Sequence, residues 1–511
     1  MAPLQSPSNS SDPYGARTSV RGPPGHGAAR SPANPTMTPS FPAAPFAPAF
    51  GTLKGHASAY LVGIGGTGMC GAAELLRARG LEVGGSDRSG GARIDRLSRI
   101  GIRVDLEDGA SPLPPSTSLV VASADVEAAH PQLVEARRRG IPVWKYAECL
   151  GALMEGRQGI AVAGCHGKTT TSSLVAQALH RAGRDPSFVI GGEVRALASS
   201  ARPGRGPHFV AEACEFDRSF HRLRPQVAIV TNLDADHLDY YRDMEEIRES
   251  FRDFARLLPE GGLLIVHEDH ADTFRRDALR RARVETYGVR EDADWRATDA
   301  WWDARDQVTR WRLTRSDGTE ARMRVPLAGH HNVLNATGAI AALVEAGLSL
   351  EEAAEGIAVF GGVGRRMERV AEAGGVLLLD DYGHHPTEIR AVIRAVRSRW
   401  GGRRVVVVFQ PHQASRTRAL LEGFGTALSE ADEVWLPPIY FARDPEEERR
   451  RVSSEDVAAR ILLHKGKAQT FASLLDVVEH GTRALRPGDI VVTMGAGDVD
   501  EVARGLAARL R

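Results

Sequence analysis

The residues whose types and spacing suggest chemistry most clearly are Gly164 to Thr171 (GCHGKTTT). They follow Ile160 to Ala163, which predicts a buried strand, and precede Ser172 to Ala182, which predicts a helix. A glycine turn between a strand and a helix aims backbone N–H groups and the helix N-terminus at one point, which suits a phosphate. Lys168 adds a positive charge for outer phosphates, and the Thr169 hydroxyl can bind Mg²⁺. We therefore expect a phosphate-binding loop, although only two residues separate its glycines.

A second glycine loop, Gly63 to Met69 (GIGGTGM), follows the apolar run Ala59 to Val62, and Ser86-Asp87 comes later. The G-x-G-x-x-G spacing, with an acidic residue about twenty positions on, is that of a dinucleotide-binding turn. A pyrophosphate can lie on such a turn, but a tight turn without a ligand gives the same pattern. Two phosphate loops in separate domains need two phosphorylated ligands, unless one loop is idle.

Acidic clusters follow two further predicted strands. Glu212 to Asp217 follows Phe209 to Ala211, and Asn232 to Asp239 follows Val227 to Val230. Open α/β sheets bind ligands at the carboxyl ends of their strands, and carboxylates and an imidazole beside a phosphate loop can hold Mg²⁺. Either cluster alone could be a ligand-free acidic turn, but two clusters at equivalent strand ends favour a metal-phosphate site.

Three polar clusters lie downstream. Gly329 to Asn335 opens a predicted helix, while Asp380 to Pro386 and Gln410 to Arg416 each follow a predicted strand. The Asn and His residues of the first cluster can cap the helix or hydrogen-bond a base edge. Because the clusters hold few pairs at metal-ligand spacing, they favour substrate binding over a zinc site.

The elements that must position these residues alternate strand, turn and helix from Ala59 onward, which is typical of parallel sheets covered on both faces. Residues 151–159 predict a linker, and the glycine-rich break at 360–364 precedes Arg365-Arg366. Residues 295–325 alternate polar and apolar side chains, as in antiparallel strands with one solvated face.

We therefore predict three α/β domains after a tail. A disordered Pro-rich tail covers 1–56, and a Rossmann-like domain covers 57–155. A central P-loop-type ATPase domain with a mostly parallel sheet covers 156–368, and a Rossmann-like C-terminal domain covers 369–511. The assignment of ligands to these domains depends on the family resemblance given below.

Bulk composition excludes several classes of protein. The chain has 511 residues, and Lys+Arg and Asp+Glu balance at 65 each, so nothing indicates a nucleic-acid or membrane-surface partner. The first fifty residues hold 11 of the 28 prolines, which predicts disorder. Four cysteines without paired spacing indicate a reducing cytoplasm, and no apolar run approaches the roughly 20 residues of a membrane helix.

Taken together, these motifs resemble the Mur ligases from about residue 57 to the C-terminus. The motifs that occur in the family's order are Gly164–Thr171, Glu212–Asp217, Asn232–Asp239, Gly329–Asn335, Asp380–Pro386 and Phe409–Arg416. Within the family, Gly63–Met69, Asp234–Asp239 and Asp381–Pro386 look like the branch that acts on UDP-N-acetylmuramate and L-alanine.

The resemblance implies an ATP-dependent ligase of peptidoglycan precursor synthesis. ATP would phosphorylate the lactyl carboxylate of UDP-N-acetylmuramate, and the amine of L-alanine would attack the resulting acyl phosphate. A tetrahedral intermediate would collapse to amide and phosphate. No nucleophilic side chain is needed, so catalysis would depend on positioning and charge neutralisation. ATP and Mg²⁺ are the implied cofactors, and the enzyme would be a cytoplasmic monomer or homodimer.

The resemblance also implies roles for individual residues. The loop that would bind the phosphates of ATP comprises Gly164, Cys165, His166, Gly167, Lys168, Thr169 and Thr170. Within it, Lys168 would contact the outer phosphates. The adenine side of ATP would bind His331, Asn332 and Asn335. Mg²⁺ would be held by Thr169, Glu215 and His237, and Arg366 would reach the phosphates on closure, so that Lys168, Glu215, His237 and Arg366 are the predicted catalytic residues. UDP would bind Gly63, Gly65, Gly66, Thr67, Gly68, Met69, Ser86 and Asp87. The amino-acid side would comprise Asp381, Tyr382, His384, His412 and Arg416.

Some positions depart from the family's usual pattern. Cys214 and Phe216 stand where Asp and Ser are frequent, His330 replaces a frequent Arg, and Gln413-Ala414 replaces Arg followed by an aromatic residue. Because Arg pairs a carboxylate better than Gln does, glycine or serine remains an alternative to L-alanine.

Other functions remain as alternatives. One is a related ligase that adds a preformed peptide, and another is a folylpolyglutamate synthase, which the first glycine loop opposes. An NAD-dependent oxidoreductase would rest on the Gly63 loop alone and leave the Lys168 loop unexplained. A catalytically silent nucleotide-binding regulator is opposed by the retention of Lys168, Thr169, Glu215 and His237.

Overall fold

The computed structural model of the protein describes residues 52–106, 111–238, 240–275, 282–442 and 444–510. Residues 1–51 of the predicted tail, and Asp239 of the acidic motif, lie outside this range. The prediction of disorder to residue 56 is wrong for its last residues. His56 lies edge-on to Trp144 at 5.6 Å, and its Nδ1 is 3.0 Å from the carbonyl oxygen of Ser118. Side-chain packing there supplies the order that composition alone did not predict.

The first sheet has five parallel strands in the order β3-β2-β1-β4-β5. Its strands are β1 (Ser58–Val62), β2 (Glu82–Ser86), β3 (Arg103–Asp105), β4 (Val120–Ala122) and β5 (Val143–Lys145). Its helices are α1 (Thr67–Ala78), α2 (Ala92–Arg99), α3 (Pro131–Arg138) and α4 (Tyr146–Met154). This strand order is that of a Rossmann half, and it places the first glycine loop after the central strand β1.

The linker predicted over residues 151–159 is wrong, because α4 runs to Met154 and the next strand begins at Gln158. A Cβ atom on Gly151 would lie 1.9 Å from the carbonyl oxygen of Arg222, so α4 packs directly on backbone of the central part. One continuous apolar core joins α1 and α4 to one face of the central sheet. Glycines and charges suggested a linker, but the burial of Leu150 and Leu153 decides the local structure.

The central sheet has ten strands in the order β15-β14-β13-β12-β11-β10-β6-β9-β7-β8. Neighbouring strands pair in parallel from β13 through β12, β11, β10, β6 and β9 to β7, whereas β8, β14 and β15 pair antiparallel at the two edges. The antiparallel strands predicted for residues 295–325 are therefore confirmed. The strands are β6 (Gln158–Ala163), β7 (Ser187–Val194), β8 (Ser199–Arg202), β9 (His208–Glu212), β10 (Val227–Val230), β11 (Leu263–His267), β12 (Arg283–Gly288), β13 (Trp295–Asp303), β14 (Val308–Arg315) and β15 (Glu320–Val325).

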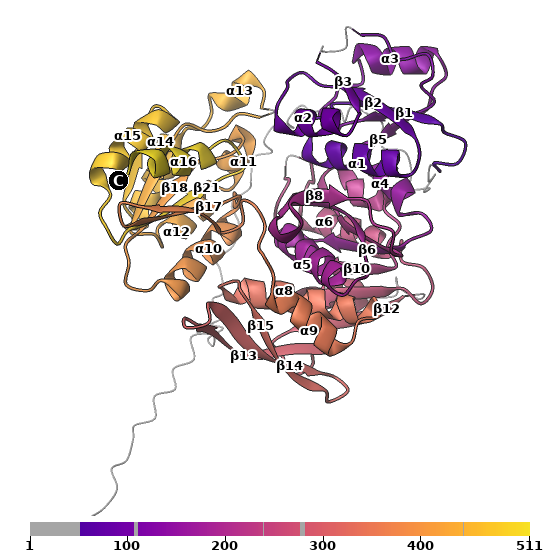
Figure 1. The fold of residues 1–511 in the computed structure, drawn as a ribbon. Coiled ribbons are helices and arrows are strands. Elements are labelled where there is room, and N and C mark those ends of the chain that lie inside the picture. The colour runs from indigo at the N-terminus through magenta and orange to yellow at the C-terminus, as the bar shows by residue number, and fades with distance from the viewer. Residues whose placement is uncertain (1–51, 107–110, 239, 276–281, 443, 511) are drawn as a thin grey trace, which may run out of the picture. The chain divides into compact units, whose positions relative to one another are not determined.

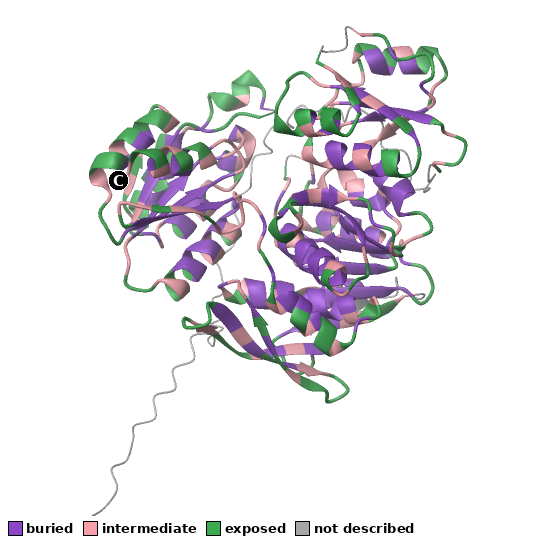
Figure 2. Cartoon of the chain, viewed as in Figure 1, coloured by how far each residue is buried: buried purple, intermediate pink, exposed green. Residues whose placement is uncertain are grey.

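Helices cover both faces of the central sheet, and its middle strands are buried (Figure 2). The apolar core on one face includes α5, α8 and α9, while α6 and α7 lie in the core that also contains α1 and α4. The helices are α5 (Lys168–Arg181), α6 (Met244–Ala255), α7 (Ala271–Arg275), α8 (His330–Glu345) and α9 (Leu350–Ala358), with short 3₁₀ turns at Arg195–Leu197, Phe216–Arg222 and Glu268–His270.

The third sheet has six strands in the order β16-β17-β21-β18-β19-β20, and only β16 is antiparallel (Figure 1). Its strands are β16 (Glu368–Ala373), β17 (Val376–Asp381), β18 (Val405–Phe409), β19 (Glu433–Leu436), β20 (Ala468–Thr470) and β21 (Ile490–Met494). Its helices are α10 (Pro386–Arg399), α11 (Ala414–Ala419), α12 (Leu421–Leu428), α13 (Glu446–Arg449), α14 (Ser454–Leu463), α15 (Leu474–Ala484) and α16 (Asp500–Arg509). Residues of α10, α12 and α14 form the core on one face, and those of α15 and α16 form the core on the other.

The predicted fold class is confirmed, with three α/β sheets that are mostly parallel. The chemically interesting segments follow the carboxyl ends of parallel strands, namely β1, β6, β9, β10, β17 and β18. Open parallel sheets bind ligands at this edge. Within the described ranges, the helices are too short or too polar to span a membrane.

Candidate active site

The loop between β6 and α5 owes its shape to its two glycines. Gly164 has φ of +131°, and a Cβ atom there would lie 2.0 Å from the Thr231 hydroxyl oxygen. Gly167 caps α5 with φ of +81°, and a Cβ atom there would lie 2.5 Å from Oδ1 of Asn335. A side chain at either position would be both strained and in collision with its neighbours. The loop conformation therefore requires glycine at both positions.

Lys168 lies at the N-terminus of α5 and turns toward Glu215. Its Nζ is 2.9 Å from Oε2 and 3.1 Å from Oε1 of Glu215, and it also donates to the carbonyl oxygens of Gly164 and Cys165. Burial disfavours the ammonium, but the Glu215 carboxylate outweighs this effect and raises the pKa of Lys168. The lysine is therefore a fixed positive charge at the loop.

Thr169 joins three segments of the chain. Its hydroxyl donates to the Glu212 carboxylate, with Oγ1 at 3.1 and 3.0 Å from the two oxygens, and accepts from Nη2 of Arg366 at 3.3 Å. Glu212 also accepts from the backbone N–H of Gly191 at 2.8 Å. Arg366 thus lies at the phosphate loop, and its contact with the phosphates on closure stays a prediction. Glu212 was not among the predicted site residues, although its place at the end of β9 was the available signal.

His237, Asp236 and Arg416 meet beside Glu215. His237 Nε2 lies 3.7 Å from Glu215 and 3.8 Å from Asp236, and burial lowers the pKa of His237 to about 4. Arg416, from α11, donates to Asp236 at 3.1 Å. Burial alone would raise the pKa of Asp236, but the charge of Arg416 and nearby imidazoles lowers it below its usual range. The third sheet therefore contributes a cation to an acidic group of the central sheet.

One ligand atom from each of Glu215, Asp236 and His237 lies within 4.8 Å of the other two. Two carboxylates and a neutral imidazole suit a divalent cation beside a phosphate loop. Asp236 was missed from the predicted metal ligands, and the acidic run Asp234 to Asp239 was the signal for it. Thr169, which was predicted as a ligand, donates its hydroxyl to Glu212 here.

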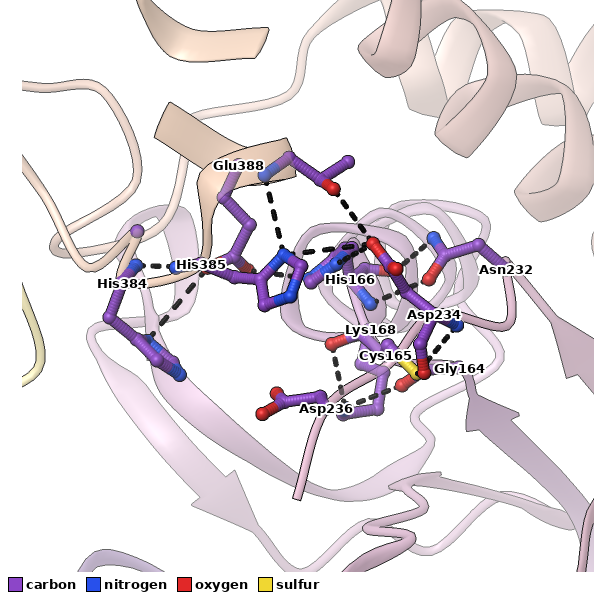
Figure 3. A network of polar contacts seen from close by, with 12 residues as sticks. Gly164, Cys165, His166, Lys168, Asn232, Asp234, Asp236, His384, His385 and Glu388 are labelled. Atoms are coloured by element: carbon purple, nitrogen blue, oxygen red, sulfur yellow. Dashed lines mark hydrogen bonds and ion pairs between the residues drawn. The ribbon is translucent and has the colours of Figure 1, made fainter. Parts of the chain in front are cut away.

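Cys165 and His166 of the loop are bonded to residues that follow β10, namely Asn232 and Asp234. The Asp234 N–H donates to Sγ of Cys165 at 3.2 Å, and the His166 N–H donates to Oδ1 of Asn232 at 2.8 Å. The His166 ring lies between two carboxylates, with Nε2 3.0 Å from Asp234 and Nδ1 3.3 Å from Glu388 (Figure 3). Burial would lower the pKa of His166, but these carboxylates raise it to about 9. Thr170, also predicted here, is buried in the first turn of α5.

The predicted adenine-side residues lie in the first two turns of α8, next to the phosphate loop. Asn335 approaches Gly167, and its Nδ2 donates to Oδ1 of Asn332 at 3.3 Å. Asn332 in turn donates to the Ala328 carbonyl oxygen at 2.8 Å. Burial lowers the pKa of His331 to about 4, so this ring is neutral at pH 7. The helix thus brings amide and imidazole groups to the loop.

His331 is expected to make the protein sensitive to acid. Its pKa in the folded state lies below the ordinary value of about 6.5, so the unfolded chain takes up this proton first as pH falls through the window from 6.5 to 4. The folded state therefore loses stability in that window. Between pH 7 and pH 4.5, the free energy of unfolding measured in urea should fall by about 2 kcal/mol less in His331→Gln than in wild type. The exposed His464→Gln should behave as wild type, and an equal loss in all three proteins contradicts the prediction.

Two neighbouring arginines, Arg365 and Arg366, lie in the segment between the central and third sheets and make different contacts. Arg365 bonds within the third sheet, to Asp380 at 3.1 Å and to the carbonyl oxygens of Gly495 and Gly497. Arg366 instead points to Thr169. The Tyr382 ring lies under both guanidinium groups, at 5.1 and 5.3 Å. The linker is therefore anchored by one arginine while the other reaches the phosphate loop.

Asp381 anchors the same segment. Its two oxygens accept from the backbone N–H groups of Met367, at 2.8 Å, and Gly383, at 2.7 Å. Burial raises the pKa of Asp381 to about 6. Both oxygens thus have backbone partners, which fits a carboxylate that orients the loop. His384 and His412, also predicted for this side, lie with ring centroids 6.3 Å apart, and His412 stacks on Tyr440.

Glu388, in the first turn of α10, was missed by the sequence prediction. Its carboxylate accepts from the N–H of His384 at 3.0 Å, and lies 3.3 Å from Nδ1 of His166 and 3.9 Å from Nη1 of Arg366. Burial would raise its pKa, but the charge of His166 holds the pKa of Glu388 well below its usual range. The sequence signal was its position as the third residue of a helix that Pro386 opens, where a capping glutamate is common.

The first glycine loop forms a separate group at the end of β1. The Gly65 N–H donates to Asp87 at 2.7 Å, and the Ser86 hydroxyl donates to Gln132 at 2.6 Å. A Cβ atom on Gly68 would lie 2.7 Å from the Tyr146 ring, which explains glycine at that position. Gly63, Gly66, Thr67 and Met69 complete the turn and the start of α1. The loop lies on a different sheet from Lys168, as two separate ligands would require.

Comparisons with known proteins match most of the described chain. Family models match residues 58–158 ("Mur ligase family, catalytic domain"), 162–343 ("Mur ligase middle domain") and 365–497 ("Mur ligase, glutamate ligase domain"). Two relatives called UDP-N-acetylmuramate–L-alanine ligase come from Geobacter sp. (strain M21) and Kineococcus radiotolerans. The first is 42% identical over 88% of this chain and 97% of its own, and the second is 44% identical over 87% and 94%.

A solved structure of UDP-N-acetylmuramate-alanine ligase from Thermotoga maritima has the same fold. It superposes with a TM-score of 0.74 and is 24% identical, covering 89% of this chain and 99% of that one. This similarity extends through all three sheets.

Proposed function

Because the chain belongs to the Mur ligase family, we propose that it joins L-alanine to the lactyl carboxylate of UDP-N-acetylmuramate, with ATP converted to ADP and phosphate. The reaction is a step of peptidoglycan precursor synthesis. The observation that supports it most is the high identity to relatives of this name over almost their full length. The proposed compartment is the cytoplasm.

The two glycine loops divide the phosphorylated ligands between them. The loop at the end of β1 binds the diphosphate of the UDP-sugar, and the loop before α5 binds the triphosphate of ATP. Residues Gly63 to Met69 with Ser86 and Asp87 belong to the first site, and Gly164 to Thr170 belong to the second. An NAD-dependent oxidoreductase would use only the first loop, so the family assignment leaves that alternative without support.

The charges around Lys168 explain how this chain could stabilise a transferring phosphoryl group. Lys168 and Arg366, which lie at the phosphate loop, would face the outer phosphates, and Arg416 brings a further positive charge beside Asp236. Glu215, Asp236 and His237 fit Mg²⁺, because they offer two carboxylates and a neutral imidazole within 4.8 Å of one another. Mg²⁺ bound there would neutralise phosphate charge. The protein's own contribution is orientation and charge, with no covalent step on a side chain.

The decisive experiment measures phosphate release from purified protein with components left out one at a time. We expect release only when ATP, Mg²⁺, UDP-N-acetylmuramate and a small L-amino acid are all present. Release that is indifferent to the sugar nucleotide would overturn the assignment. Product mass then identifies the bond formed.

The amino acid itself is tested by a panel of L-alanine, glycine, L-serine and a preformed tripeptide. We expect L-alanine to give the highest kcat/KM. Gln413 is the N-cap residue before α11, with φ of +66°, and its N–H donates to the Tyr440 carbonyl oxygen, so its backbone is part of the loop fold. A preference for the tripeptide would instead indicate a peptide-adding member of the family.

A further inference from the structure

Three side chains from two different sheets meet beside the phosphate loop, apart from the group around Glu215. His166 comes from the loop before α5, Asp234 follows β10, and His385 immediately precedes α10. Figure 3 shows the two rings beside one another and next to the Asp234 carboxylate, and the ring centroids are 4.7 Å apart with a tilt of 36°. We propose that His166, Asp234 and His385 bind a transition-metal ion of the Zn²⁺ class across the boundary between the central and third sheets.

The spacing of the three groups fits such an ion. One ligand atom from each residue lies within 4.8 Å of the other two. His166 Nε2 is 3.0 Å and His385 Nδ1 is 3.6 Å from the same Asp234 oxygen. A tetrahedral ion with bonds of about 2.0–2.1 Å separates its ligands by about 3.3 Å, which lies between these two distances. The two imidazole nitrogens lie at most 4.8 Å apart, so closing the three atoms around a metal would bring the rings together by up to about 1.5 Å.

The His385 ring has unused capacity for a ligand. The side chain is 4% exposed, yet its Nε2 has no hydrogen-bond partner within the part of the chain that the structure describes. Its Nδ1 accepts one long bond, 3.3 Å, from the N–H of Thr387. Buried imidazoles normally have partners at their nitrogens. Nδ1, the nitrogen that faces Asp234, thus has a single long bond that a metal ion would replace, whereas the unpartnered Nε2 is the other nitrogen of the ring.

His166 already has the outer partner that metal-binding histidines use. Its Nδ1 lies 3.3 Å from Oε1 of Glu388, which fixes the orientation of the ring while Nε2 faces Asp234. A carboxylate on the far nitrogen of a ligating histidine raises its basicity and orients it. Asp234 is held in turn by the Thr387 hydroxyl at 2.7 Å. On metal binding, the proton on Nε2 of His166 leaves to solvent and the metal takes its place.

The donor set selects the kind of metal. Two imidazoles and one carboxylate suit Zn²⁺, Co²⁺ or Ni²⁺, whereas Mg²⁺ prefers oxygen ligands. The neighbouring group of Glu215, Asp236 and His237 is richer in oxygen and would keep Mg²⁺. A metal at the new site would connect the phosphate loop to α10 and so oppose separation of the central and third sheets.

The experiment titrates Zn²⁺ into the full-length, metal-depleted protein in excess Mg²⁺, with binding followed by calorimetry and by the rise in Tm. We expect one equivalent of Zn²⁺ to bind and to raise Tm. His385→Asn and Asp234→Asn should weaken this binding at least about tenfold, and Glu388→Gln should weaken it less. With Co²⁺ in place of Zn²⁺, the visible bands of a four-coordinate ion should appear in wild type and disappear in His385→Asn.

The variants are chosen so that a loss of metal binding can be distinguished from a loss of the fold. Asn is a favoured N-cap residue, so His385→Asn preserves the bond to the Thr387 N–H that begins α10. His464→Asn, which removes a surface imidazole from the third domain, is the matched control and should bind as wild type. The proposal is overturned if wild type binds no Zn²⁺ in excess Mg²⁺. It is equally overturned if His385→Asn and Asp234→Asn bind as wild type does, or if binding is lost only in Glu215→Gln.

Discussion

Lys168→Ala is expected to lower kcat for phosphate release by about a thousandfold. Lys168 is the first residue of α5, its ammonium is held at the phosphate loop by Glu215, and its pKa is raised, so it is charged at every physiological pH. Alanine removes the charge that we propose faces the outer phosphates, and it leaves the loop glycines unchanged. The measurement is kcat with saturating ATP, Mg²⁺, UDP-N-acetylmuramate and L-alanine.

Binding of UDP-N-acetylmuramate is the internal control for this variant. The first glycine loop lies on another sheet, so Lys168→Ala should bind the sugar nucleotide within about twofold of wild type in calorimetry. Lys54→Ala removes an exposed lysine and should keep full turnover. Parallel loss of sugar-nucleotide binding in Lys168→Ala would contradict the assignment of the two loops to two ligands.

Glu215→Gln is expected to destabilise the protein by about 3 kcal/mol in the absence of nucleotide and Mg²⁺. The side chains of Lys168 and Glu215 are only 13% and 2% exposed, and the glutamine leaves the lysine charge buried without its carboxylate. Removing one partner of a buried ion pair costs more than removing both, because only the single change leaves an uncompensated charge. The free energy of unfolding is measured in urea.

The double variant Lys168→Met/Glu215→Gln distinguishes this cause from lost packing. Both substitutions keep side-chain volume and together leave no buried charge, so we expect the double variant to be more stable than Glu215→Gln alone. Glu260→Gln, at an exposed position, should stay within about 0.5 kcal/mol of wild type. A double variant that is less stable than Glu215→Gln, by the sum of two independent losses, would show that the pair is not coupled.

Much of the fold followed from local patterns in the sequence. Buried strands such as β6 and β10 are short apolar runs, and α5 and α8 are amphipathic or apolar segments with glycine before them. Each such pattern reports the environment of its own segment, so strands, helices and their order could be predicted. The linker predicted at 151–159 failed because the pattern could not show that α4 packs on another sheet.

The sequence indicated candidate residues of the site, but it did not indicate which of them contact each other. Lys168, Glu215 and His237 could be named as candidates because each follows the carboxyl end of a parallel strand, and their roles stay predictions. Asp236 and Glu388 were missed as functional groups because their roles depend on partners far away in the chain, Arg416 and His166. Nothing in the sequence near either residue specifies those distances.

The sequence by itself determined the glycine loop at Gly164 and its lysine, because a turn between strand and helix needs only neighbouring residues. The tertiary structure decided what surrounds that loop. Arg366 reaches Thr169, Arg416 reaches Asp236, and Glu388 reaches His166 only through the packing of the third sheet beside the central one. Local geometry is set by backbone conformation over a few residues, whereas these contacts depend on how two cores pack together over hundreds of residues.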